Sequence, residues 1–308
     1  MKKALFTLVF LAASCAGLFA QAFGGWQMPK IEMRYSQKFE DVNYASDSQV
    51  YHNMDIYLPK EEKESYPVVI HIYGSAWYSN NSKAVADLGT IVQALLDGGY
   101  AVVTPNHRSS SDATFPAQIN DIKAVVRFIR ANAGTYHLDT SFIATSGFSS
   151  GGHLASLAAT SGGESDLEGD VGGNLGFPSS VDACCDWSGP IDLLRMDCGG
   201  VRGEGATAPE EALLGFPVKG NEAAVAAISP ITYADPNDPP VIIFHGTADN
   251  VVPSCQGTWL YENLRSAGVT AELHMIAGGG HGFRMYTKST LGRMVEFLDE
   301  AREAKSKP

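Results

Sequence analysis

The chain has 308 residues, of which 44% are hydrophobic and 18% are charged, and its formal net charge is −12. Such a composition is typical of a globular protein that buries a large apolar core. An acidic chain without a basic run is a poor partner for nucleic acid or for an anionic membrane surface, so both classes of function are excluded.

The first 22 residues have the pattern of a secretory signal peptide. A basic start is followed by the apolar residues 4–13, and residues 20–22 form an A-x-A cleavage pattern. The apolar stretch is too short to span a membrane, and no later stretch comes near the ~18 apolar residues that a spanning helix needs. We therefore predict removal of residues 1–22 and export to the periplasm or the exterior. The alternatives are a buried N-terminal helix and a lipid anchor at Cys15.

Beyond this segment, apolar runs of strand length alternate with segments of helix length. Residues 66–73 are apolar on both faces, as a buried parallel strand is, and residues 121–133 repeat apolar side chains at helical spacing. The expected strands are residues 66–73, 100–105, 142–145, 181–187, 241–245 and 271–276. The expected helices are residues 82–96, 121–133, 254–267 and 289–304, with a further helix that begins at about Ser150.

This alternation predicts an α/β fold, in which a doubly wound, mostly parallel sheet carries helices on both faces. We expect residues 23–308 to form a single domain. Residues 162–178 are rich in glycine and polar side chains, and we expect a loop there. Residues 191–237 lack strong strand character, so we interpret them as a small insertion over the carboxyl edge of the sheet.

The segment 143–155, IATSGFSSGGHLA, lies where an expected strand turns into a helix. Residues 147–151 fit G-x-S-x-G, the nucleophile elbow, in which the residues two before and two after the serine must be small. A chain with 32 glycines matches this pattern easily by chance, so the position after a strand carries the argument. Ser149 has glycine at both places, whereas Ser150 has Phe148 at one of them. Ser149 is therefore the expected nucleophile, and the backbone N–H of Ser150 is an expected oxyanion donor.

A nucleophilic serine needs a histidine as base and a carboxylate that orients it, and in this architecture the acid precedes the histidine. Among the downstream histidines, His245 and His274 lie within expected strands, where a role in the core or the sheet is the better interpretation. His281 lies in a glycine-rich loop after the last strand, and Asp249 follows the preceding strand. Alone, Asp249 would be read as a turn former, but together with Ser149 and His281 it is the expected acid.

The second oxyanion donor is expected in the loop after the first strand, at Gly74-Ser75-Ala76-Trp77. Esterases commonly carry H-G-G-G there, because glycines let backbone amides approach the substrate oxygen. Only Gly74 matches, although Ser75 or Ala76 could still donate a backbone N–H. Trp77 and Trp187 are either core aromatics or walls of the substrate cleft that stack on an aromatic acyl group or a sugar.

Four cysteines follow residue 22, namely Cys184, Cys185, Cys198 and Cys255. A chain of this size does not need disulfides, although an exported one can form them. Cys184 and Cys185 are neighbours on an expected strand, so their side chains face opposite ways. Either Cys198 is bridged to one of them or they are buried free thiols, and the pairing stays open. The spacing does not match a zinc site.

With these motifs the chain resembles the α/β-hydrolase superfamily and, within it, the acetylxylan and feruloyl esterases of the BD-FAE-like group, close to the hormone-sensitive-lipase-like carboxylesterases. The matching stretches lie within about residues 55–283 and are residues 68–77, 106–108, 115–121, 147–151, 186–190, 227–230 and the loops of Asp249 and His281. The resemblance implies an α/β-hydrolase fold and a serine esterase that removes acetyl or feruloyl groups from plant polysaccharides such as xylan. It implies an acyl-enzyme on Ser149, with no metal or cofactor. It also implies a structural pair of Arg108 and Asp121.

Two alternatives remain. A serine peptidase of the prolyl-oligopeptidase type resembles the chain in the same three loops, but it carries a large propeller for which residues 23–65 are too few. A catalytically inactive hydrolase-fold binding module is disfavoured because all three catalytic positions are filled. The expected partner is an esterified polysaccharide or oligosaccharide, and the acyl preference and oligomeric state stay open.

Overall fold

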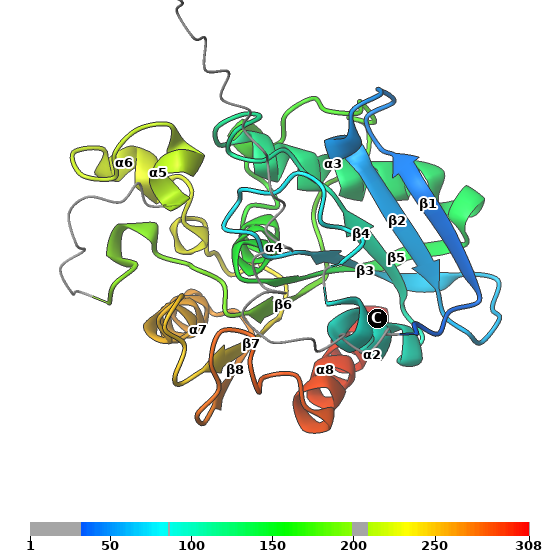
Figure 1. The fold of residues 1–308 in the computed structure, drawn as a ribbon. Coiled ribbons are helices and arrows are strands. Elements are labelled where there is room, and N and C mark those ends of the chain that lie inside the picture. The colour runs from blue at the N-terminus through cyan, green and yellow to red at the C-terminus, as the bar shows by residue number, and fades with distance from the viewer. Residues whose placement is uncertain (1–31, 86, 199–208, 308) are drawn as a thin grey trace, which may run out of the picture. The chain divides into compact units, whose positions relative to one another are not determined.

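A single mixed sheet forms the centre of the computed structural model, which describes residues 32–85, 87–198 and 209–307. Within these residues eight strands lie in the order β1-β2-β4-β3-β5-β6-β7-β8 (Figure 1). Their bounds are β1 Gln37–Asn43, β2 Asn53–Leu58, β3 Tyr66–Ile72, β4 Ala101–Pro105, β5 Leu138–Phe148, β6 Ala183–Trp187, β7 Val241–Gly246 and β8 Ala271–Ile276. The pairs β1/β2 and β2/β4 are antiparallel and all others are parallel. The predicted signal peptide and Cys15 lie outside the described residues, as do residues 199–208 of the predicted insertion.

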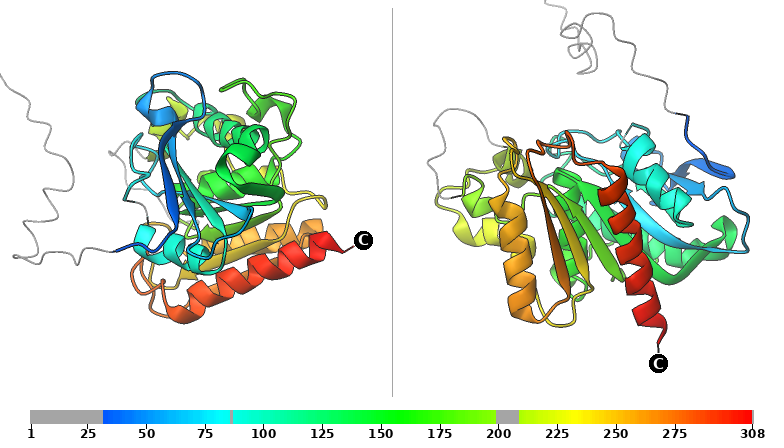
Figure 2. Two further views of the ribbon diagram at one scale, coloured as in Figure 1. Left: turned by 90° about the vertical axis from the view of Figure 1, so that its right-hand side faces the viewer. Right: turned by 90° about the horizontal axis from the view of Figure 1, so that it is seen from below.

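Helices cover both faces of this sheet, as the alternating sequence predicted (Figure 2). The helices α3, α4 and α7 supply apolar side chains to the core on one face, and α2 and α8 supply them on the other. The bounds are α2 Gln93–Asp97, α3 Ala117–Asn132, α4 Ser150–Thr160, α5 Pro209–Leu214, α6 Glu222–Ala226, α7 Cys255–Ala267 and α8 Lys288–Ser306. No helix in the described part of the chain combines the length and the apolar character that crossing a membrane requires.

The central strands are buried on both faces, which explains their continuous apolar sequences. Every residue of β3 is buried, and successive side chains point to opposite sides of the sheet. Val68 and Ile70 therefore enter the core beneath α3 and α4, while Val69 enters the core beneath α2 and α8. The same alternation places Cys184 in the first core and Cys185 in the second, and both are free thiols.

Cys198 is bonded to Cys255, so the alternative of a bridge to Cys184 or Cys185 is wrong, and the alternative of buried free thiols holds for these two cysteines. The two cysteines of β6 are buried in the two cores, where a thiol outside them cannot reach. Cys198 instead follows a short helical turn, Leu193–Arg195, that lies against the start of α7. The bridge joins two residues that are 57 positions apart in the chain. Cys198 is also the last described residue before the gap at residues 199–208.

The predicted helix at residues 82–96 forms only in its second half. A π-helical turn spans Leu88–Val92 and continues into α2. Lys83 explains the late start, because its backbone N–H donates to Asn106 Oδ1 at 3.1 Å and its ammonium pairs with the buried Asp55. These contacts hold the preceding residues in a loop against β2. Strands β1 and β2 themselves were not predicted.

Candidate active site

Ser149 lies on a sharp turn between the end of β5 and the start of α4. Its backbone has φ 56° and ψ −123°, a conformation that costs a residue with a side chain roughly 1–3 kcal/mol. The flanking glycines make the turn possible. A Cβ atom at Gly147 would lie 2.1 Å from the carbonyl oxygen of Gly151, and one at Gly151 would lie 2.0 Å from that of Ile72. The requirement for small residues on both sides of Ser149 therefore has a direct steric cause.

The structure brings together the three side chains of the predicted triad. Nε2 of His281 lies 2.9 Å from Oγ of Ser149, and Nδ1 of His281 lies 2.8 Å from Oδ2 of Asp249. The three residues come from loops after β5, β7 and β8, which all end at the carboxyl edge of the sheet. The other carboxylate oxygen of Asp249 accepts the backbone N–H groups of Val251 and Val252, both at 2.9 Å.

These contacts keep Asp249 ionised and orient the ring of His281. Burial acts to raise the pKa of Asp249, but hydrogen bonds from His281, Val251 and Val252 outweigh it and hold the pKa below its usual value. An ionised carboxylate can only accept hydrogen bonds, so Nδ1 of His281 carries its hydrogen. Nε2 is then left to accept the hydroxyl hydrogen of Ser149, as a general base does.

Of the three predicted oxyanion donors, Ser75 is the one that the structure does not favour. Its backbone N–H donates to Oγ of Ser150 at 2.8 Å and is thereby engaged within the protein. Ala76, with φ 50°, and Ser150, at the N-terminus of α4, both line the pocket beside Ser149. Gly74 allows this approach, because a Cβ there would lie 2.8 Å from Cβ of Ser149. The backbone N–H groups of Ala76 and Ser150 are therefore the candidate pair.

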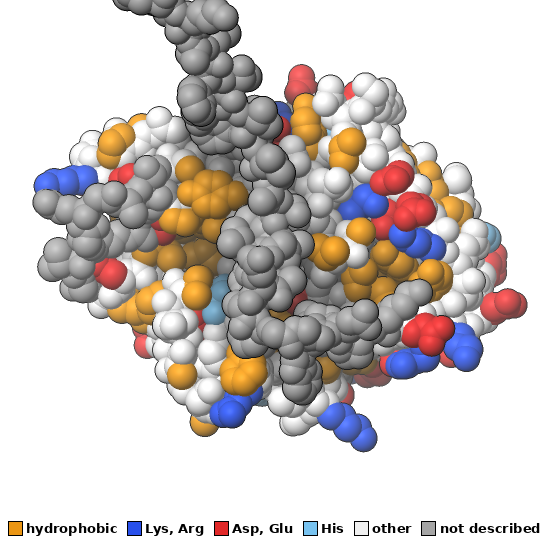
Figure 3. Space-filling model, viewed as in Figure 1, with side chains coloured by type: hydrophobic (Ala, Val, Ile, Leu, Met, Phe, Trp, Pro, Cys, Tyr) orange, Lys and Arg blue, Asp and Glu red, His pale blue; other side chains and the backbone are white. Residues whose placement is uncertain are grey.

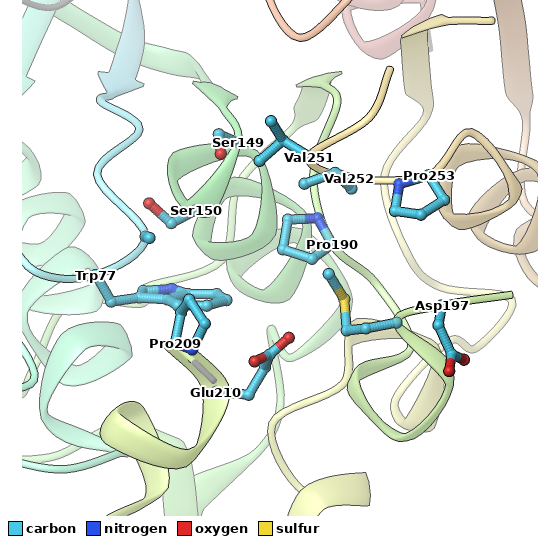
Figure 4. Close-up of a pocket in the computed structure, with 12 residues that line it drawn as sticks. Trp77, Ser149, Ser150, Pro190, Asp197, Pro209, Glu210, Val251, Val252 and Pro253 are labelled. Atoms are coloured by element: carbon cyan, nitrogen blue, oxygen red, sulfur yellow. The ribbon is translucent and has the colours of Figure 1, made fainter. Parts of the chain in front are cut away.

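A pocket of about 300 Å³ opens beside Ser149 (Figure 4). Its walls come from the loop after β3, the elbow, the loop after β7 and the predicted insertion, and they are mostly apolar. Hydrophobic side chains also gather on the face of the molecule that Figure 3 shows. The lining residues are Ala76, Trp77, Ser149, Ser150, Pro190, Met196, Asp197, Pro209, Glu210, Val251, Val252 and Pro253.

The two tryptophans named from the sequence have different roles. Trp77 lines the pocket although only 2% of it is exposed, so it is both a core aromatic and a wall. Trp187 does not line the pocket. It is buried at the end of β6 and stacks on Phe244 with ring centroids 4.1 Å apart, so its predicted role as a substrate contact is wrong and the core alternative holds.

Several residues around the site were missed. Phe148, the second residue of the elbow, packs on the ring of His281 with centroids 4.6 Å apart. Its place next to Ser149 was the available signal. Met196, Asp197 and Glu210 line the pocket from the insertion, whose sequence has no motif that points to them.

His153 lies on α4, one helical turn after Ser149. His153 is fully buried, and its Nε2 lies 2.6 Å from the carbonyl oxygen of Ile228. Burial lowers the pKa of His153 to about 4, so this imidazole is neutral at pH 7. Arg108 and Asp121 form the expected ion pair at 2.6 Å. Among the residues that the structure describes, no three His, Cys, Asp or Glu side chains gather into a metal site.

The chain is similar to several known esterases. The esterase LipQ of Mycobacterium tuberculosis is 30% identical over 74% of this chain and 53% of its own length. The solved structure of a truncated form of a carbohydrate esterase from gut microbiota is 44% identical, with a TM-score of 0.83 over 87% of this chain and 97% of that one. The structure of a bifunctional GH43-CE from Bacteroides eggerthii is 49% identical, with a TM-score of 0.82 over 86% of this chain and 35% of that one.

The chain spans about half the length of the curated relatives it matches, with 53% of LipQ covered and 45% of LipM, a probable carboxylic ester hydrolase of the same organism. The model of the BD-FAE family matches residues 54–264, from β2 into α7. With this match and the α/β-hydrolase fold described above, the chain belongs to the BD-FAE family.

Proposed function

We propose that the protein is a serine carboxylic ester hydrolase that acts on acylated carbohydrate. The observation that carries the proposal is the unbroken series of hydrogen bonds from Asp249 through His281 to Ser149. Both serine and imidazole are placed for acyl transfer, because the hydroxyl needs a base within hydrogen-bond reach and the base needs an orienting acid.

In the proposed mechanism, Ser149 attacks the ester carbonyl while Nε2 of His281 takes its proton. Asp249 holds the imidazole in position and stabilises the imidazolium electrostatically. The backbone N–H groups of Ser150 and Ala76 donate to the oxyanion of the tetrahedral intermediate, aided by the positive end of α4. His281 then protonates the leaving alcohol, and a water molecule resolves the acyl-enzyme by the reverse sequence of steps.

The substrates that we propose are acetyl or feruloyl esters on plant cell-wall polysaccharide, with xylan as the first candidate. Two structural relatives carry the words carbohydrate esterase or CE in their names, which supports a carbohydrate ester. We also propose export, because residues 1–22 have the sequence pattern of a signal peptide. N-terminal sequencing of the protein from the exporting cell should start at Phe23, and a lipid on Cys15 would point to an anchor instead.

A fluorophosphonate probe tests the nucleophile without knowledge of the substrate. The probe should label wild type once per chain at Ser149 and should not label Ser149→Ala. Ser150→Ala removes the neighbouring hydroxyl, and with it the acceptor of the Ser75 N–H, but keeps the backbone N–H of residue 150, and it should retain the label. Label on Ser150, or no label on a folded wild type, would refute the proposed role of Ser149.

Substrate comparison separates the proposal from its alternatives. Wild type should hydrolyse p-nitrophenyl acetate, and acetylated xylan and methyl ferulate tested side by side would decide the acyl preference. A peptidase of the prolyl-oligopeptidase type would cleave proline-containing peptides and leave esters as poor substrates. An inactive binding module would hydrolyse none of these compounds.

A further inference from the structure

Phe283 lies two residues after His281 and leaves its ring in solvent. The residue is 69% exposed, although nearby Met285 on the same loop is fully buried. The guanidinium of Arg284, which is also exposed, lies over the ring at 5.1 Å from its centroid. An isolated exposed apolar residue is common on protein surfaces, and exposure alone therefore does not assign a role to Phe283.

The backbone around Phe283 supplies a second observation. Gly282 and Arg284, its two neighbours, both have left-handed conformations, with φ 75° and 63°. Glycine adopts this conformation freely, but a residue with a side chain such as Arg284 is strained in it. The turn is held by a hydrogen bond of 3.0 Å from the N–H of Gly280 to the carbonyl oxygen of Phe283. The loop thus fixes a strained backbone that turns an aromatic ring outward beside His281.

The chemistry of ester hydrolysis determines which part of the substrate must lie next to His281. His281 has to protonate the oxygen of the leaving alcohol, so the alcohol must lie against its Nε2. The pocket of about 300 Å³ is lined by Ser149 and by the candidate oxyanion donors, but His281 is not among its lining residues. An acyl group in this pocket leaves the alcohol to extend outside it along the exposed loop that follows His281, in which Phe283 is the exposed aromatic residue.

We propose that Phe283 is the binding platform for the sugar ring that carries the ester, a role that rests on the proposed function. One face of a pyranose is lined by C–H groups with a partial positive charge, and an aromatic ring presents a negative π face. Stacking of the two removes apolar surface of both from water. The contact is made by the leaving alcohol and is independent of the acyl group, so it selects for carbohydrate esters over esters of small alcohols.

The test compares two acetate esters that differ only in the alcohol, a mono-acetylated methyl β-xyloside and ethyl acetate. The readout is the ratio of their kcat/KM values in wild type, Phe283→Ala, Phe283→Leu and Phe283→Tyr. The ratio should fall about tenfold in the Ala and Leu variants, chiefly through a higher KM for the xyloside, and should be restored by Tyr. Phe177→Ala is the matched control, because Phe177 is an exposed phenylalanine, at 43%, in the loop after α4, and its ratio should equal that of wild type.

The outcomes distinguish the platform from the activity itself. An unchanged ratio in Phe283→Ala overturns the platform while leaving the esterase intact. A ratio in Phe283→Leu equal to that of wild type also overturns it, since apolar bulk without a ring face would then suffice. A wild type that hydrolyses neither ester, or a Ser149→Ala variant as active as wild type, overturns the proposed function and this inference with it.

Discussion

The glycines around Ser149 hold the site in a geometry that no other residue permits. We expect Gly151→Ala to destabilise the protein by about 3 kcal/mol and to abolish fluorophosphonate labelling, because its Cβ would lie 2.0 Å from the backbone oxygen of Ile72. Backbone on both sides cannot move away without displacing Ser149. Gly163→Ala is the control, since nothing lies within 4 Å of its Cβ position, and it should change stability by less than about 0.5 kcal/mol. Urea unfolding of the two variants measures the contrast, and equal stability would contradict the steric argument.

His153 makes the stability of the fold depend on pH. Its pKa is lowered to about 4 by burial, whereas an unfolded histidine titrates near 6.5. Between these values the unfolded chain binds the proton and the folded chain does not, so stability is lost as the pH falls from about 6.5 to 4. The loss that His153 contributes is on the order of 3 kcal/mol. The free energies of unfolding of wild type and His153→Gln, plotted against pH, should therefore run parallel above pH 7 and converge below pH 6.5. Plots that stay parallel throughout would show that this imidazole does not titrate as its burial requires.

At the level of single residues, the sequence predicted the catalytic side chains, because their role follows from their position in the chain. Ser149, Asp249 and His281 each follow an apolar run at the edge of the sheet. The errors concern partners that only the fold supplies. The backbone N–H of Ser75 donates to Oγ of Ser150, a residue 75 positions away in sequence, and Trp187 stacks on Phe244 of the next strand.

At the level of secondary structure, burial alone does not separate the strands that were predicted from those that were missed, since the partly exposed β8 was predicted. Strands β3, β4, β6 and β7 are buried throughout, and their runs of apolar residues identify them. Strand β1, with residues that are all exposed or intermediate, has no such run and was missed. Strand β2 was also missed, because Asn53 and Asp55 interrupt its apolar residues although five of its six residues are buried. The late start of the helical segment that ends at Asp97 could not be predicted for another reason. The ion pair of Lys83 with Asp55 joins two segments that are separate in the sequence.

The disulfide between Cys198 and Cys255 links two walls of the pocket. Asp197 precedes one cysteine and Pro253 lies shortly before the other, and both line the pocket. Because the bridge closes a separation of 57 residues, its loss should destabilise the protein by up to about 4 kcal/mol. We expect the double variant Cys198→Ser/Cys255→Ser to unfold at a lower temperature than oxidised wild type.

Dithiothreitol provides the control for this prediction. The reductant should lower the melting temperature of wild type to that of the double variant and should leave the double variant unchanged. A double variant as stable as wild type would mean that the bridge adds nothing to the packing of α7 against the insertion.

At the level of the whole molecule, one sheet separates two apolar cores, and Cys184 and Cys185 each report on one of them. Burial raises the pKa of the Cys184 thiol to about 12 and that of Cys185 well above its usual value, so neither forms the reactive thiolate in the folded protein. Labelling by Ellman's reagent then requires an opening that exposes β6 to solvent.

Strand β6 lies between β5 and β7 in the middle of the sheet and pairs with both. Exposure of either apolar core at β6 therefore requires that the hydrogen bonds between these strands break. We therefore expect both thiols to react at one common rate, set by the free energy of global unfolding. The measurement uses Cys15→Ser chains that carry Cys184→Ala or Cys185→Ala, so that one free thiol is followed at a time, with the rate corrected for the stability of each variant. A thiol that reacts more than about tenfold faster than global unfolding allows would show that one face of the sheet opens alone, and the two cores would then be separate cooperative units.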